Sequence, residues 1–253
     1  MTSQTCKNCK SDFTNNFCSH CGQRSIANKR LQIDEVLHDF FDNTFNIHKG
    51  LFYTFYYLII NPGKVGHTYL EGQRKTYTNP TRYMVIALAF QTFIDYWFET
   101  TEVIKNDTYF RFSFLSQQIN DSMEIWNVKL AVEYLLLTNL FQIVTIPALF
   151  YLLFRFLHFN YTELLTVSFY FNPTVLFINM SILLITKVIF GIYISKEIII
   201  LIFLVYLIWS NLSFFKTVPF WSRLLRILTV IGIFMFLRVF LLPYLLSVMI
   251  PMT

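Results

Sequence analysis

The sequence predicts an all-α integral membrane protein with a small zinc ribbon at its N-terminus. Of its 253 residues, 55% are hydrophobic and 14% are charged, whereas an ordinary soluble domain carries about 25% charged residues. The mean hydropathy is +0.49, and a water-soluble fold of this length cannot bury so much apolar surface. We predict a zinc ribbon over 1–24, a basic linker with amphipathic, interfacial helices over 25–81, and a transmembrane domain of about five helices over 82–253.

The four cysteines predict the zinc site. Cys6 and Cys9 form one C-x2-C pair, and Cys18 and Cys21 form a second. A spacing of two residues lets one tight turn present two sulfurs to a tetrahedral ion, and a site closed by four thiolates is structural rather than catalytic. The polar segment 1–6 has no signal-peptide core, which favours metal binding in a reducing cytoplasm over a two-disulfide knot.

The linker predicts an amphipathic helix. From Leu31 to Phe45, apolar residues recur at three- and four-residue spacing, as on one face of a helix. Asp34, His38 and Asp42 share the polar face, where they form either a second metal site or an ordinary solvated surface. Amphipathic helices routinely produce such rows, so the solvated surface is favoured.

The aromatic run Leu51–Ile60 predicts an interfacial or re-entrant helix. Ten residues span about 15 Å as a helix, which is half the thickness of a bilayer. Asn61-Pro62-Gly63 follows at once and ends the helix.

A basic cluster precedes the first predicted span. Its members are Lys64, His67, Arg74, Lys75 and Arg82. They form either a site for an anionic lipid headgroup or ligand, or the positive charge that retains this end in the cytoplasm. Ten lysines and arginines stand against six acids up to Arg82, an excess too small for strong phosphate-driven binding, so no nucleic-acid partner is expected.

Apolar stretches predict five spans. They cover 82–99, 130–154, 164–186, 190–210 and 225–250. The positive-inside rule puts the N-terminus and the loops 155–163 and 211–226 in the cytoplasm, with the long loop 100–129 outside. Aromatic residues in that loop predict that it packs on the membrane surface or on a partner.

Polar residues within the spans predict either helix–helix contacts or a pathway. Asp95 and Arg238 fall at similar depth, and a pair between them would relieve two costly charges. Glu133 is the alternative partner of Arg238. The broader alternatives are polar contacts that hold helices together and a substrate path along proline-broken helices.

Several segments resemble a known family. They are Cys18-x2-Cys21-Gly22-Gln23, Asn61-Pro62-Gly63, and Tyr69-x2-Gly72-x-Arg74-Lys75-x-Tyr77-x2-Pro80. Over about residues 5–90 the chain resembles a group of bacterial inner-membrane proteins, the domain of unknown function 3667. The resemblance implies a multi-pass protein of the cytoplasmic membrane with a cytoplasmic zinc ribbon, and it implies no activity.

The sequence favours a function without catalysis. It contains neither H-E-x-x-H nor G-x-S-x-G, and an intramembrane enzyme using Glu133 or His158 would need a positioned partner. We therefore predict an inner-membrane adaptor or accessory subunit whose ribbon docks a partner protein, with membrane lipids around its helices. The alternative is a small transporter or lipid-handling protein with an intramembrane polar site.

Overall fold

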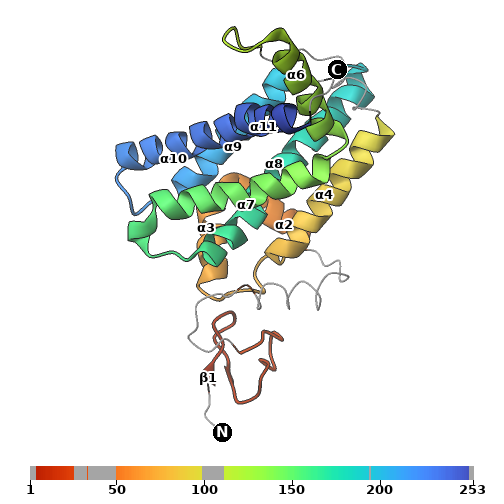
Figure 1. Ribbon diagram of the computed structural model, residues 1–253. Helices are drawn as coiled ribbons and strands as arrows, with labels where there is room; N and C mark the ends of the chain where they lie inside the picture. Colours follow the sequence, from red (N-terminus) through yellow and green to blue (C-terminus); the bar gives the residue numbers. More distant parts are fainter. Residues whose placement is uncertain (1–3, 26–32, 34–49, 99–110, 194, 251–253) are drawn as a thin grey trace.

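A helical bundle carries the ribbon at one end (Figure 1). The computed structural model describes residues 4–25, 33, 50–98, 111–193 and 195–250. Apart from Ile33, the helix expected over 31–45 lies outside these ranges, and so does the acidic row on it. The ribbon holds β1 (Gln4–Thr5) and β2 (Asp12–Phe13), which pair antiparallel. The helical elements are α2 (Gly50–Ile60), α3 (Pro62–Leu70), α4 (Pro80–Trp97), α6 (Gln117–Val132), α7 (Leu135–Leu153), η1 (Arg155–Leu157), α8 (Tyr161–Phe190), α9 (Lys196–Phe214), α10 (Phe220–Met235), the π-helix η2 (Phe236–Leu241) and α11 (Leu242–Met249).

The prediction of a mostly helical, membrane-type fold is confirmed. Within the described ranges, four helices are long and apolar enough to cross a membrane: Leu135–Leu153, Tyr161–Phe190, Glu197–Phe214 and Phe220–Met249. The last runs continuously through α10, η2 and α11. Four spans and not five are therefore identified by length and composition.

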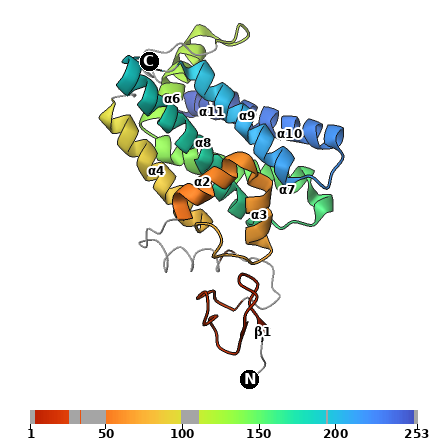
Figure 2. The same cartoon turned by 180° about the vertical axis from the view of Figure 1, so that it is seen from behind.

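The first predicted span is a helix of lower hydropathy. α4 has 18 residues, but Arg82, Gln91 and Asp95 interrupt its apolar character, and it is not among the four. It packs along α8, the 30-residue helix that runs beside it through the bundle (Figure 2). α8 begins with a capping box between Asn160 and Glu163 and ends at Gly191, whose φ is +69°, a conformation that favours glycine.

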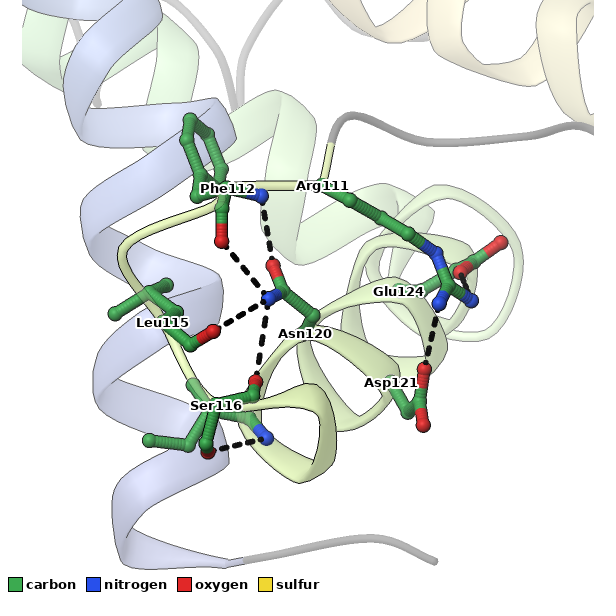
Figure 3. Close-up of polar contacts among 8 residues, drawn as sticks. Arg111, Phe112, Leu115, Ser116, Asn120, Asp121 and Glu124 are labelled. Carbon is green, nitrogen blue, oxygen red and sulfur yellow. Dashed lines mark hydrogen bonds and ion pairs between the residues drawn. The ribbon is translucent and has the colours of Figure 1, made fainter.

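The prediction of a loop over 100–129 is wrong for its second half, because α6 begins at Gln117. Asn120 joins α6 to the turn before it: its amide accepts from Phe112 N at 2.8 Å and donates to the carbonyls of Phe112 and Leu115 (Figure 3). Arg111 forms ion pairs with Asp121 at 3.1 Å and Glu124 at 2.9 Å (Figure 3).

The aromatic side chains of this region pack on the C-terminal helix. Phe112 meets Phe240 edge-on at 4.9 Å between ring centroids, and Trp126 Nε1 donates to the carbonyl of Ile250 at 3.1 Å. These two aromatic residues therefore pack within the chain, and contact of the region with the membrane surface or with a partner stays a prediction.

The break between α2 and α3 rests on the C-terminal half of α9. Two carbonyls at the end of α2 accept hydrogen bonds from α9: Leu58 from Tyr206 OH at 3.1 Å and Ile59 from Trp209 Nε1 at 3.3 Å. Such bonds are required where a helix ends away from water. Phe52, on the other face of α2, is 81% exposed. α2 is thus a short apolar helix with one packed and one exposed face, and its interfacial or re-entrant position stays a prediction.

Gly63 allows α3 to touch α9. Its backbone N–H donates to Ser213 Oγ at 3.1 Å, and Ser213 Oγ donates in turn to Asn61 Oδ1 at 3.3 Å. A Cβ on Gly63 would collide with the carbonyl of Ser213. One turn later, His67 Nε2 donates to the carbonyl of Phe214 at 2.8 Å, and its ring stacks on Phe214.

We expect Gly63→Ala to destabilise the protein by about 2 kcal/mol or more, because backbone rather than a movable side chain opposes the added methyl group. The measurement is the melting temperature of the detergent-solubilised protein. Gly232→Ala is the matched control, since a Cβ there meets nothing within 4 Å. Equal melting temperatures for the two variants would contradict this account of the contact.

Candidate metal centre and its contact with the helical bundle

The four cysteine sulfurs lie together in the ribbon. Their Sγ atoms are all within 4.8 Å of one another; Cys6 and Cys21 are 3.6 Å apart, and Cys9 and Cys18 are 3.5 Å apart. A tetrahedral zinc ion with Zn–S bonds of about 2.3 Å has sulfur–sulfur edges of about 3.8 Å. The donor set therefore fits one tetrahedral, thiolate-preferring metal ion, for which Zn²⁺ and iron are the usual occupants.

Two copies of one backbone turn present the sulfurs. In each, the first cysteine both donates and accepts a backbone hydrogen bond: Cys6 N→Ser11 O 2.9 Å, Lys10 N→Cys6 O 3.0 Å, Cys18 N→Gln23 O 2.8 Å and Gly22 N→Cys18 O 2.8 Å. The residue after the second cysteine has a positive φ in both turns, 63° at Lys10 and 68° at Gly22. Glycine at position 22 adopts this conformation without strain, whereas its equivalent in the first turn is a lysine.

Ser11 contributes a hydroxyl that the cysteine spacing did not reveal. Its Oγ lies 2.9 Å from Cys9 Sγ and 3.2 Å from Cys18 Sγ. The hydrogen bond from Ser11 lowers the pKa of Cys9 to about 5 and also lowers the pKa of Cys18, whereas burial raises the pKa of Cys21 to about 12. Ser11 thus favours the thiolate form of two sulfurs that would bind the metal.

Gln23 connects the ribbon to the helical bundle. Its side chain is 4% exposed, and Nε2 donates to the carbonyl of Gly72 at 2.6 Å. Gly72, in the loop between α3 and α4, has a φ of 96°, which favours glycine. A second bond joins Thr76 Oγ1 to Asn8 Oδ1 at 3.0 Å. The backbone carbonyl of Gln23 also accepts the hydrogen bond from Cys18 N that closes the second cysteine turn. Gln23 therefore belongs to the metal-binding turn and at the same time contacts the Gly72 loop.

The predicted basic cluster divides among several environments. Lys64 and Lys75 are exposed. His67 packs on Phe214, as described above, and the Arg74 guanidinium lies 5.8 Å from the ring of Tyr69. The last member, in the first turn of α4, is half-buried Arg82. His67 therefore packs on Phe214, and anion binding by the five residues stays a prediction.

The predicted intramembrane charges lie on three elements. Asp95 is half-buried in α4, Arg238 is half-buried in the π-helix η2, and Glu133 is exposed at the end of α6. The pairing of Asp95 with Arg238 stays a prediction. Sequence reasoning missed the π-helix, although Pro243 gives a signal because it lacks the N–H that an α-helix needs there.

Other polar side chains join helices to one another. Asn139 Nδ2 donates to Gln91 Oε1 at 2.9 Å, which links α7 to α4. Tyr83 OH and Thr174 Oγ1 are 3.0 Å apart, which links α4 to α8. These two contacts are of the kind that holds membrane helices together.

The segment that contacts the ribbon matches a known family model. Residues 49–92 match the model of a family described as a protein of unknown function (DUF3667). The DUF3667 segment contains α2, α3, the loop at Gly72 and most of α4, so the resemblance is confirmed here; the ribbon lies outside the match. No curated protein and no solved structure matches the chain.

We expect purified protein to contain about one equivalent of zinc per chain and to lose affinity as the pH falls. Protons compete for the thiolates, and the raised pKa of Cys21 means that this thiol releases a proton when metal binds near pH 7. Elemental analysis and titration calorimetry in two buffers measure both effects. Metal uptake without proton release would contradict the assignment, and His20→Ala, an exposed position, is the control.

We expect Gln23→Ala to loosen the ribbon from the Gly72 loop without emptying the metal site. The variant loses a buried hydrogen bond, so the loop should exchange its amide hydrogens faster by roughly fivefold or more, as about 1 kcal/mol implies. Lys75→Ala, an exposed change on the same loop, should leave exchange unchanged. Equal exchange in both variants would mean that Gln23 does not hold the ribbon against the Gly72 loop.

Proposed function

We propose that this chain is a non-enzymatic membrane adaptor whose metal-bound ribbon docks a cytoplasmic partner protein. The four-thiolate site leaves no coordination position for a substrate, which supports a structural metal. The four apolar helices would anchor the chain among membrane lipids, and the ribbon would be held at the membrane surface by the Gly72 loop.

The observation that carries the proposal is the fixed placement of a mostly exposed ribbon. Gln23 and Asn8 attach one side of it to the DUF3667 segment, while Phe17 is 59% exposed and His20 is exposed. The exposed residues of the ribbon, Phe17 among them, are accessible to a partner protein. Anchoring by the loop would present that surface in one orientation and so reduce the entropy lost on binding.

Charge supports a cytoplasmic ribbon. The ribbon, α3, the start of α4 and the loops on either side of η1 and before α10 share one end of the bundle (Figure 1). The basic residues described there are Lys7, Lys10, Arg24, Lys64, Arg74, Lys75, Arg82, Arg155, Lys216, Arg223 and Arg226, and the acidic ones are Asp12, Glu71 and Glu163. Such an excess of lysine and arginine is typical of the cytoplasmic side of a bacterial inner-membrane protein.

The test is affinity purification from native membranes of the wild type and of the Cys9→Ser/Cys21→Ser variant. A stoichiometric protein that disappears with the two thiolates is expected, because the ribbon loses its metal and its fold. His20→Ala, which keeps all four cysteines, is the matched control. Retention of every partner by the serine variant would overturn the proposal.

Orientation is tested with the same chain, since all four cysteines of the protein lie in the ribbon. With the metal chelated, a membrane-impermeant maleimide should label inverted membrane vesicles and leave intact cells unlabelled. Labelling of intact cells would place the ribbon outside and exclude a cytoplasmic partner.

A further inference from the structure

A buried asparagine in α8 has no hydrogen-bond partner among the described residues. Asn172 is 3% exposed, and neither Nδ2 nor Oδ1 of its amide has a hydrogen-bond partner. Leaving a buried amide unsatisfied costs about 1–3 kcal/mol, and lipid around the bundle offers no replacement bonds. Such a group in a native structure requires an explanation.

A small cavity adjoins this amide. It offers about 10 Å³ to the centre of a water molecule and is lined by residues of α7, α8 and α9. About one sphere of that size is the space that a single buried water needs. The cavity is therefore large enough for one water and too small for an organic substrate.

Three polar side chains line the cavity. They are Asn172 and Ser168 of α8 and Asn211 of α9. Asn211 uses Nδ2 in a 2.8 Å bond to the carbonyl of Leu207, so its Oδ1 remains as an acceptor. A buried water binds stably with two to four such partners, whereas an apolar cavity of this kind stays dry.

We infer that one water molecule binds in this cavity and joins Asn172 to Ser168 and Asn211. The water satisfies the Asn172 amide and links α8 to α9. Phe214 also lines the cavity, and its carbonyl accepts the hydrogen bond from His67 of α3. The site lies outside the metal centre and is independent of the proposed adaptor function.

A structure of the full chain in lipid, at a resolution that shows ordered water, tests the site directly. We expect one peak about 2.7–3.2 Å from the Asn172 amide and from at least one of the other two side chains. An empty cavity, an amide turned into a direct bond with protein, or a peak with the many oxygen ligands of a cation would each overturn the inference.

A double-mutant cycle tests the link in solution. Asn172→Leu and Asn211→Leu should each lower the melting temperature by several degrees. The double variant should lose clearly less than the sum, because both amides are then removed together and neither is left without its partner.

The control cycle pairs Asn172→Leu with Ile146→Val, an apolar change in the lining of the same cavity. It measures the coupling that arises from a shared cavity alone. Additive effects in the first cycle, or equal coupling in both, would overturn the inference.

Discussion

The structure depends on one constraint: a chain that breaks its helix away from water must find hydrogen-bond partners for the exposed backbone. α2 ends at Ile60 and α3 begins at Pro62, and the partners come from α9, about 150 positions later. Tyr206 and Trp209 donate hydrogen bonds to carbonyls at the end of α2, and Ser213 accepts one from the backbone N–H of Gly63 at the start of α3. This joint between distant segments sets the direction of α3 and so places the Gly72 loop.

The position of the ribbon depends on these contacts in turn. Gly72 follows α3 directly and accepts the bond from Gln23, which also closes the second cysteine turn. The metal site is thus positioned by α9 through α3, although no apolar core is shared between the ribbon and the bundle among the described residues. Polar contacts of this kind fix orientation more than they add stability, because each is worth only about 1 kcal/mol.

Local patterns in the sequence predicted local features well. The cysteine spacing, the stop at Asn61-Pro62-Gly63 and the apolar runs each correspond to an observed element, because turn chemistry and hydropathy act over a few residues. α6 was missed, although Asn120, Met123, Asn127 and Leu130 are buried at helical spacing. The role of His67 could not be predicted, since its partner Phe214 is distant in sequence and the choice between packing and anion binding depends on tertiary contacts.

The two cysteine turns share a shape but not a composition. Glycine adopts the left-handed conformation freely at position 22, whereas Lys10 holds it at a cost of about 1 kcal/mol. The first turn therefore relies more on the bound ion than the second does. When the ion is lost, we expect the turn around Asn8 to lose its shape more readily than the turn that holds Gln23, so the bond between Thr76 and Asn8 should weaken before the bond between Gln23 and Gly72.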